Sequence, residues 1–411
     1  MLNEFFVRNY KNLLMDEKEP LILGGLNIFI GANGCGKSNL FEAIKFLPDC
    51  IEYGLQKTVR TYRKGLASLL NKNILTPNKI SFKWQFDPIP NMRDKIPVEY
   101  ELDLSIDDYN YFSVEHETMQ EIRPRVTTET NKWKYLGFNF GKGVVNIYEG
   151  NRPRGFEHPE DEEISGDEIA LKVLSSPKKY PAIEHIKKQV SLWRFYNANH
   201  ISIRNIKDRP SKIDPSDLYL DETGENLAIV LFNLMQKDHL EFDFEAEFNT
   251  LLKALFDGFD GLKFPPSDTQ HLEMKLKDKA IRKPLALHEL SDGTIRMLCW
   301  VAILCHPEPS PLICIDEPEV GLHPAWINIL ADLIKVAVQR GKTQVLIATH
   351  SPDLIDCFSD YPESVIVTGT DDEKNATFGR LDPEELQPWL ERYRLGEMYR
   401  NRELVIGGWP Y

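Results

Sequence analysis

The stretch that decides the fold is NIFIGANGCGKSNL, residues 27–40. It consists of an apolar run, a glycine-rich loop and the start of a helix that we expect over residues 40–47. Gly31, Gly36, Lys37 and Ser38 fit the pattern G-x-x-x-x-G-K-[ST]. Glycines at these positions let successive backbone N–H groups turn inward towards phosphate oxygens. The stretch therefore predicts a strand, a phosphate-binding loop and a helix in that order.

Each polar group in this loop has a predicted task. Lys37 brings a positive charge to the outer phosphates, and the Ser38 hydroxyl is suited to Mg²⁺. The start of the helix adds its unpaired N–H groups and its dipole. The predicted phosphate contacts are Gly31, Asn33, Gly34, Cys35, Gly36, Lys37, Ser38 and Asn39.

Length and composition place the chain among ordinary globular proteins. Its 411 residues favour two structural lobes, and 42% of them are hydrophobic and 27% charged. No apolar run approaches the ~20 residues that span a bilayer, and the N-terminus lacks the basic and apolar regions of a signal peptide. The six cysteines include no C-x-x-C pair, and several lie in apolar runs. We therefore expect a cytoplasmic protein with reduced thiols and no membrane partner.

The net charge argues weakly against a surface dedicated to binding DNA. The net charge is −14, whereas non-specific DNA binding needs clustered lysines and arginines. Two local basic groups are present, and for both the favoured interpretation is solvated surface charge. They are Lys57, Arg60, Arg63 and Lys64, and separately Arg152 and Arg154.

The first part of the chain predicts an antiparallel sheet. After the first helix, apolar and polar residues alternate, with many aromatic and β-branched side chains, which is typical of half-buried antiparallel strands. We expect strands at residues 4–8, 21–23, 80–86, 98–104 and 111–114, and further strands within 133–148.

A helical insertion follows. Residues 155–168 form an acidic loop, after which helices are expected at 169–173, 181–190, 226–235 and 242–256, with a strand at 191–196. No heptad pattern is sustained, so we expect no long coiled-coil arm. The predicted organisation is an N-terminal lobe over 1–150, a helical insertion over 151–265 and a C-terminal lobe over 266–411.

The C-terminal lobe carries two strands that end in ionisable residues. Residues 312–318, LICIDEP, form a buried strand that ends in Asp316 and Glu317, at the edge where open α/β sheets hold ligands. We expect Asp316 to hold Mg²⁺ and Glu317 to act as general base towards water. A second buried strand, residues 344–349, precedes His350 after one helical crossover at 327–339.

A third motif opens a helix. Residues 290–294, LSDGT, can cap a helix through Ser291 or Asp292, and the helix start can receive an anion. By contrast, the acidic run Asp371–Glu373 lies between two short strands and is interpreted as a hairpin turn.

The order of these motifs resembles that of ABC-type ATPases, with Walker A, signature, Walker B and switch histidine. The variants LSDGT, DEPEVGLHP at 316–324 and THSP at 349–352 are similar to those of the RecF/SMC/OLD branch. The chain end, with LGEM at 395–398 and Gly407-Gly408, resembles stand-alone bacterial ATPases described as AAA-family or AAA15-like. The resemblance implies an α/β head with a mixed, mainly parallel sheet flanked by helices, plus the antiparallel lobe and the insertion.

The resemblance also implies a mechanism. ATP and Mg²⁺ would be bound between two heads, so that Ser291 and Gly293 of one subunit meet the γ-phosphate bound at Lys37 of the other. Catalysis would rest on Glu317, His350 and Lys37, with Ser38 and Asp316 on the metal. Residues 320–323 would form the D-loop at that interface. Lys11 and Asn12 fall where this branch contacts nucleotide, and the Q-loop glutamine is open between Gln56 and Gln85.

Two family features are absent from the sequence. It has no zinc-hook C-x-x-C, and the ~60 residues after His350 are fewer than a TOPRIM nuclease domain needs. The resemblance suggests an ATPase that dimerises or forms a higher oligomer and controls a separate effector, for which we expect a nuclease in antiviral defence. A RecF-like ATPase that binds DNA directly is the alternative, and a transporter ATPase is disfavoured by the motif variants.

Overall fold

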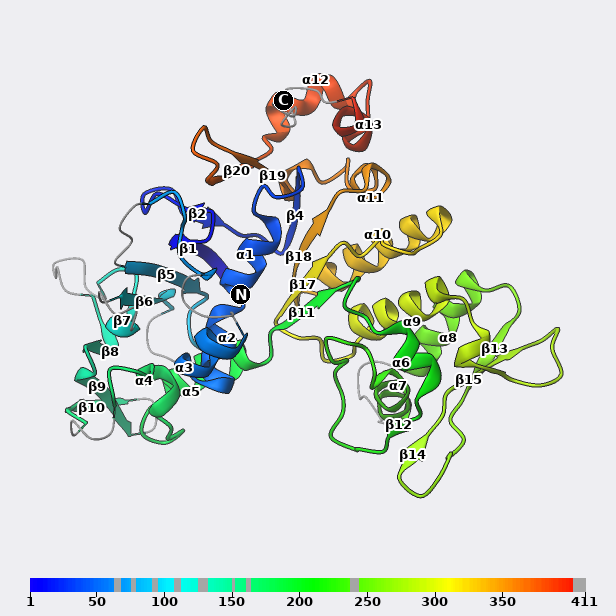
Figure 1. Ribbon diagram of the computed structural model, residues 1–411, viewed down its shortest axis with the longest axis horizontal. Helices are drawn as coiled ribbons and strands as arrows, with labels where there is room; N and C mark the ends of the chain where they lie inside the picture. The colour runs from blue at the N-terminus through cyan, green and yellow to red at the C-terminus, as the bar shows by residue number, and fades with distance from the viewer. Residues whose placement is uncertain are drawn as a thin grey trace. The chain divides into compact units, whose positions relative to one another are not determined.

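The computed structural model describes most of the chain, and its contacts fall into two units. It describes residues 1–62, 68–74, 79–90, 95–106, 112–124, 132–149, 152–159, 164–236 and 244–401 (Figure 1). The first unit contains Met1–Trp193 and Ile366–Arg380, and the second contains Arg194–Val365 and the chain from Leu381 onward. The lobe boundaries at residues 150 and 265 stay predictions.

A nine-stranded antiparallel sheet dominates the first unit. Its order is β10-β9-β8-β7-β6-β5-β1-β2, with β3 paired to β1, which confirms the predicted antiparallel region. The strands are β1 Leu2–Tyr10, β2 Leu13–Leu14, β3 Leu21–Ile22, β5 Lys79–Phe86, β6 Val98–Ile106, β7 Phe112–Glu121, β8 Lys134–Asn139, β9 Lys142–Glu149 and β10 Arg152–Glu157.

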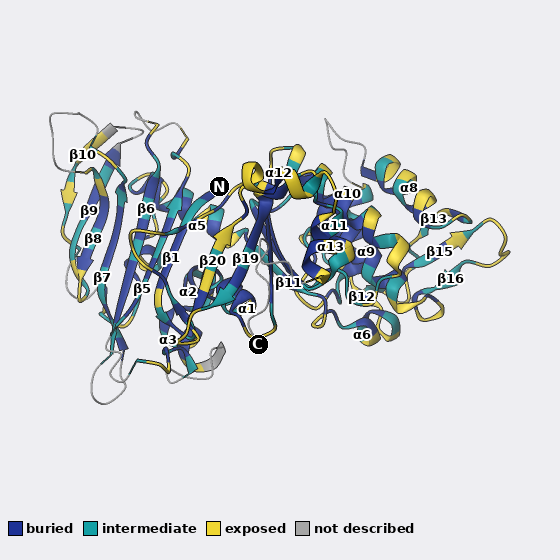
Figure 2. Ribbon diagram, turned by 90° about the horizontal axis from the view of Figure 1, so that it is seen from above, coloured by how far each residue is buried: buried dark blue, intermediate teal, exposed yellow. Residues whose placement is uncertain are grey.

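Alternation along these strands builds the core. In β5 the side chains of Phe82, Trp84 and Phe86 are buried and those between them are half-exposed (Figure 2). The Phe82 ring stacks on Phe46 at a centroid distance of 4.8 Å and on Trp84 at 5.3 Å. Aromatic stacking adds to the burial of these large side chains, and it joins the sheet to the helix that carries Phe46.

The helix after the phosphate loop differs from its prediction. It begins earlier, as α1 Lys37–Ile44, and a second helix, α2 Phe46–Tyr53, follows Lys45. Pro48 explains the break, because it has no N–H to donate to the carbonyl of Ile44 and is tolerated only in the first turn of a new helix. The other helices of this unit are α3 Leu55–Lys57, the π-helical turn η1 Thr58–Tyr62, α4 Ala170–Val173 and α5 Pro181–Ser191.

Only part of the two basic groups predicted from the sequence lies within the described residues. Lys57 and Arg60 lie in α3 and η1, whereas Arg63 and Lys64 lie outside the described residues. Arg154 is exposed in β10, and the Arg152 side chain is outside the described part of the chain.

Three more strands complete the first unit. β4 Leu26–Gly31 lies beside β19 Val365–Thr370, which forms an antiparallel hairpin with β20 Ala376–Arg380. The Asn375 amide donates to Asp371 Oδ1 at 2.8 Å within the hairpin turn. The acidic run Asp371–Glu373 is therefore a turn, as predicted, and the described residues contain no cluster suited to a metal ion.

The second unit is built on three parallel strands in the order β11-β17-β18, with bounds Arg194–Asn197, Leu312–Asp316 and Gln344–Thr349. β17 and β18 are almost fully buried, as the apolar runs predicted. The strand expected at 191–196 starts later, because α5 continues through Ser191 and the Trp193 amide still bonds to Val190 O.

Helices and small sheets surround this core. The helices are α6 Ile203–Asp208, α7 Leu227–Gln236, α8 Phe244–Leu255, α9 Asp292–Leu304, α10 Pro324–Gln339, α11 Pro352–Asp356, α12 Pro383–Leu390 and α13 Leu395–Arg400, with 3-10 turns η3 Leu287–Glu289 and η4 Pro362–Ser364. The strands are β12 Ser211–Lys212 with β14 His271–Leu272, and β13 Phe259–Lys263 with β15 Lys275–Asp278 and β16 Leu285–Ala286. Within the described ranges, no helix combines the length and the apolar character that a bilayer crossing requires.

A buried carboxyl in the first unit predicts a pH-dependent stability. Glu117 accepts the amides of Ala170 and Leu171, at 2.6 and 2.7 Å, and the Tyr100 hydroxyl at 2.9 Å. Burial raises the pKa of Glu117 to about 7. Because the unfolded chain ionises this group at lower pH, its contribution to stability is lost as pH rises towards 7. From about pH 5.5 to about pH 8.5 we expect the free energy of unfolding of the wild type to fall by ~2 kcal/mol relative to that of Glu117→Gln.

Chemical denaturation of both proteins across this pH range measures the effect. Glu157→Gln is the matched control, because a hydrogen bond from Lys179 lowers the pKa of Glu157 and leaves it ionised throughout. Equal pH dependence of wild type and Glu117→Gln would contradict the prediction.

Candidate nucleotide-binding site

The phosphate loop has the geometry of a helix start that can receive anions. Gly36 precedes α1 with a φ of 120°, and the helix begins at Lys37 without a side-chain cap. The Lys37 side chain is 5% exposed, and its Nζ donates to the carbonyl oxygens of Gly31 at 2.8 Å and Ala32 at 3.0 Å. Lys37 thus lies inside the loop, while Asn33, Gly34 and Ser38 are exposed, which suits contact with a phosphate group.

Two glycines of the loop are required by close packing. A Cβ at Gly31 would lie 2.0 Å from the Thr368 carbonyl oxygen, and φ at Gly31 is +147°. A Cβ at Gly36 would lie 2.7 Å from Ala376 Cβ and 3.1 Å from Asn12 Nδ2. The loop therefore packs against the β19–β20 hairpin and the segment after β1, and neither position has room for a side chain.

Lys11 and Asn12 lie beside the first turns of α1. The Asn39 side chain donates to Asn12 Oδ1 at 2.8 Å, and Lys11 forms an ion pair with Glu42. Asn12 also accepts the Ala376 amide through its carbonyl oxygen at 2.7 Å. These contacts place both residues next to the loop, and their contact with nucleotide stays a prediction.

In the second unit, the two carboxylates at the end of β17 are held by asparagines. Asn197 Nδ2 donates to Asp316 Oδ2 at 3.0 Å, and Asn199 Nδ2 donates to Glu317 Oε2 at 2.8 Å. Glu317 has a φ of +53°, and its amide bonds to Ala348 O at 2.8 Å. A non-glycine residue in this region is strained, and such strain is concentrated at functional sites. Sequence reasoning missed both asparagines, although NANH at 197–200 directly follows the strand predicted over 191–196.

A third carboxyl, Glu319, organises the residues after β18. Its Oε1 accepts the Thr349 hydroxyl at 2.6 Å and the His350 amide at 3.3 Å. Burial raises the pKa of the Glu319 carboxyl. His350 Nε2 lies 3.9 Å from Glu317 Oε1, so the turn brings the predicted base and switch histidine together. Sequence reasoning assigned no role to Glu319, because a glutamate in a polar turn carries no distinguishing pattern.

The signature segment packs on the same turn of the second unit. Ser291 caps α9 by accepting the Thr294 amide at 3.1 Å, as predicted. A Cβ at Gly293 would lie 2.8 Å from Gly321 O, so the signature glycine touches the D-loop segment. Trp300 donates to Pro318 O at 2.9 Å, and Arg296 donates to Ala198 O. Ser291 is exposed and Gly293 half-exposed, so the helix start faces solvent in this chain.

The predicted site residues thus form two groups, one in each unit. The first comprises Lys11, Asn12, Gly31, Asn33, Gly34, Cys35, Gly36, Lys37, Ser38 and Asn39, and the second comprises Ser291, Gly293, Asp316, Glu317 and His350. Hydroxyl and carboxylate oxygens, such as those of Ser38 in the first unit and Asp316 in the second, are ligand types that Mg²⁺ accepts, and their contact with the metal stays a prediction.

Comparison with solved structures defines the class of fold. An SMC head bound to the C-winged helix domain of ScpA is 15% identical, with a TM-score of 0.55, covering 94% of this chain and 99% of that one. An SMC head with an extended coiled coil, bound to the C-terminal domain of ScpA derived from Pyrococcus furiosus, is 16% identical with a TM-score of 0.54, covering 95% and 98%. The fold is therefore that of an SMC head domain.

Sequence comparison gives the family. The family model described as "AAA domain, putative AbiEii toxin, Type IV TA system" matches residues 26–142 and 176–356, which is more than half of the chain. The protein belongs to this family of ATPase domains. The RecF/SMC-like resemblance and the head fold expected from the motifs are thereby confirmed.

ATP-binding subunits of transporters are also similar over part of the chain. The energy-coupling factor transporter ATP-binding protein EcfA2 of Lactobacillus delbrueckii subsp. bulgaricus is 29% identical over 177 residues, 41% of this chain and 58% of that protein. EcfA2 of Lactobacillus johnsonii is 26% identical over 165 residues, 36% of this chain and 54% of that protein. The chain spans just over half the length of these relatives. Together with the family, they support ATP binding and ATP hydrolysis.

Proposed function

We propose that the protein is an ATP-driven switch in which two copies enclose ATP and Mg²⁺ head to tail. The observation that carries the proposal is the signature turn, where Ser291 and Gly293 reach the surface at the start of α9. A helix start that is polar and exposed suits the γ-phosphate of a nucleotide bound at Lys37 of a second copy. ATP would then join the two copies, because its γ-phosphate contacts both.

The residues after β17 and β18 would perform the chemistry. Glu317 would take the proton from the attacking water, with one oxygen held by Asn199 and the other facing His350. Glu319 would position His350 through its backbone amide and through Thr349. Lys37 and the partner's signature turn would stabilise charge on the phosphates, and bound Mg²⁺ would neutralise further charge. Loss of the γ-phosphate would release the two copies.

We propose that the switch controls a separate effector protein in the cytoplasm. The first effector to test is a nuclease that acts in antiviral defence. The family name, with its toxin system, and the two SMC heads bound to ScpA support a head that works with a partner. A RecF-like ATPase that contacts DNA itself is the second candidate, and four exposed cations of the second unit, Lys263, Lys279, Arg282 and Lys283, favour it.

Light scattering on Glu317→Gln tests the switch. With ATP and Mg²⁺ this variant is expected to double in mass or grow further, because ATP is bound and not consumed. Adding Lys37→Ala should abolish the growth, since Lys37 is the cation inside the phosphate loop. Ser291→Arg is the matched control for the half of the site that the second copy supplies. Because Ser291 is an exposed residue of the signature turn, this variant should still bind nucleotide, and its mass should not increase with ATP. If the mass of Glu317→Gln is as independent of ATP as that of the other two variants, the proposed dimer around ATP is contradicted.

A further inference from the structure

One face of α9 contacts the segments that carry the ionisable residues of the second unit. Gly293, Arg296 and Trp300 are spaced three and four residues apart, so they lie on the same side of the helix. Trp300 donates to the carbonyl oxygen of Pro318, the residue after Glu317, at 2.9 Å. This side of α9 is therefore attached to the turn that follows β17.

Arg296 occupies the middle of this face and contacts two segments of backbone. Its guanidinium group donates to the carbonyl oxygen of Ala198. Its Nε lies 2.8 Å from the position that a Cβ would take on Gly321, where φ is +76°. Among the described residues, no carboxylate lies within ion-pair distance of Arg296. The contacts of this charged group are therefore made with the segment after β11 and with the turn after β17.

The segment held by Arg296, residues 197–199, carries the two asparagines that hold the carboxylates. The Ala198 amide donates to the main-chain oxygen of Asp316 at 3.1 Å, and the Asn199 amide donates to Asn197 Oδ1 at 2.8 Å. The Nδ2 groups of the two asparagines then reach Asp316 Oδ2 at 3.0 Å and Glu317 Oε2 at 2.8 Å. Both carboxylates thus depend on one short turn of backbone.

This turn needs an anchor on each side. Ala198 is fully buried, whereas Asn199 is exposed. An exposed amide side chain loses conformational freedom when it is held in one geometry, so its bond to Glu317 requires a fixed backbone beneath it. Asp316 fixes that backbone from β17, and Arg296 fixes it from α9. A hydrogen bond from a charged donor is stronger than one between neutral groups, which suits Arg296 to this task.

We infer that Arg296 is a positioning residue for ATP hydrolysis. By holding Ala198 it sets the two asparagines, and through them the carboxylates of Asp316 and Glu317. Because Arg296 lies in the second turn of α9, the same contact ties the signature turn to these carboxylates. The part played by the carboxylates rests on the proposed function, whereas the hold on residues 197–199 is a property of the chain without nucleotide.

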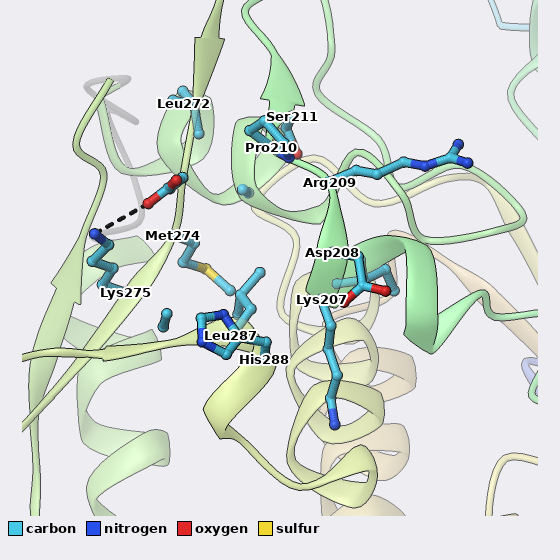
Figure 3. A pocket seen from close by; sticks show the side chains of 14 residues that line it. Lys207, Asp208, Arg209, Pro210, Ser211, Leu272, Met274, Lys275, Leu287 and His288 are labelled. Atoms are coloured by element: carbon cyan, nitrogen blue, oxygen red, sulfur yellow. Dashed lines mark ion pairs between the residues drawn. The ribbon is translucent and has the colours of Figure 1, made fainter. Parts of the chain in front are cut away.

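A second cation at the start of α9 provides the matched control. Lys207, at the end of α6 (Figure 3), forms an ion pair with Asp292 at 2.5 Å. Lys207 and Arg296 are both half-buried. Among the described residues, neither Lys207 nor Asp292 bonds to residues 197–199 through its side chain. Lys207→Met therefore removes a cation from the same end of the helix and leaves the turn with the asparagines intact.

Hydrogen exchange of the full chain without nucleotide tests the hold on the turn. In Arg296→Met the amides of Ala198 and Asn199 are expected to exchange at least ~10-fold faster than in the wild type, because their turn has lost one anchor. The amides of β17 should keep their wild-type rates, and so should every amide of this turn in Lys207→Met. Unchanged exchange of the turn in Arg296→Met would overturn the inference, as would equally faster exchange throughout β17.

Steady-state hydrolysis tests the consequence for the reaction. Groups that orient a catalytic or metal-binding side chain typically contribute about 10- to 100-fold to activity. Arg296→Met should therefore lower kcat at least ~10-fold, with ATP affinity within about threefold of the wild type. Lys207→Met should keep kcat within about threefold. A wild-type kcat in Arg296→Met, or the same loss in both variants, would overturn the positioning role.

A double-mutant cycle separates positioning from a general structural effect. Asn199→Ala is expected to lower kcat in the wild-type background. In the Arg296→Met background it should lower kcat by less than about threefold further, because both residues act on the same turn. Losses that multiply in full would show that the two residues act independently, and would overturn the inference. If Glu317→Gln does not grow in mass with ATP, the proposed dimer fails, and the exchange test still decides whether Arg296 holds the turn.

Discussion

Replacement of Glu317 by Gln is expected to lower the steady-state rate of ATP hydrolysis by at least ~100-fold, the range of a lost general base. The amide keeps the size of the side chain and can still accept the Asn199 hydrogen bond, so the turn after β17 should stay folded. It cannot take a proton from water. Phosphate release at saturating ATP measures the loss, and nucleotide affinity should stay within a few-fold of the wild type.

Glu319→Gln is the neighbouring control for this prediction. Its carboxyl is buried, and it holds Thr349 and the His350 amide through an oxygen that a glutamine also possesses. We expect a loss below tenfold for Glu319→Gln, because its proposed role is to position His350. Similar losses in the two variants would show that the turn as a whole has been disturbed. Turnover at the wild-type rate in Glu317→Gln would show that another group is the base.

Replacement of Gly31 by Ala is expected to destabilise the first unit by ~2–5 kcal/mol and to abolish ATP binding. The added Cβ would lie 2.0 Å from the Thr368 carbonyl oxygen, so β19 would have to move. Overpacking of this kind costs ~1–3 kcal/mol, and the positive φ adds ~1–2 kcal/mol. Denaturation midpoints and binding of a fluorescent ATP analogue measure the two effects.

Gly34→Ala separates packing from backbone strain. Gly34 also has a positive φ, +79°, but a Cβ there meets no atom within 4 Å. The free energy of unfolding of this variant should fall by only ~1–2 kcal/mol, which is the cost of the positive φ alone. If both variants lose the same stability, the contact with Thr368 does not govern the fold of the loop.

Short-range patterns predicted the elements that carry the chemistry. The phosphate loop and the strands before Asp316 and His350 are found where the sequence placed them, because their signals lie within ten residues: glycines, an apolar run and a terminal charge. The family comparison confirmed the class that these motifs suggested.

The remaining features depend on residues distant in sequence. Asn197 reaches Asp316 across 119 positions, and Asn199 reaches Glu317 across 118, so no local pattern links them. Lys263 lies opposite Lys275 only because strand register pairs β13 with β15. The break after Ile44 had a local signal in Pro48, which the helical pattern around it obscured.

The hairpin of β19 and β20 has a consequence for the order in which the protein is completed on the ribosome. The phosphate loop appears early in synthesis, yet Gly31 and Gly36 pack against Thr368 and Ala376. Asn71 likewise bonds to Asn375 at 3.0 Å. At ~5–20 residues per second, the segment that closes around the loop emerges roughly 17–70 s after the loop itself. During that interval the nascent chain holds a P-loop whose packing partners do not yet exist, so a chain that stops before residue 366 would lack a finished nucleotide pocket.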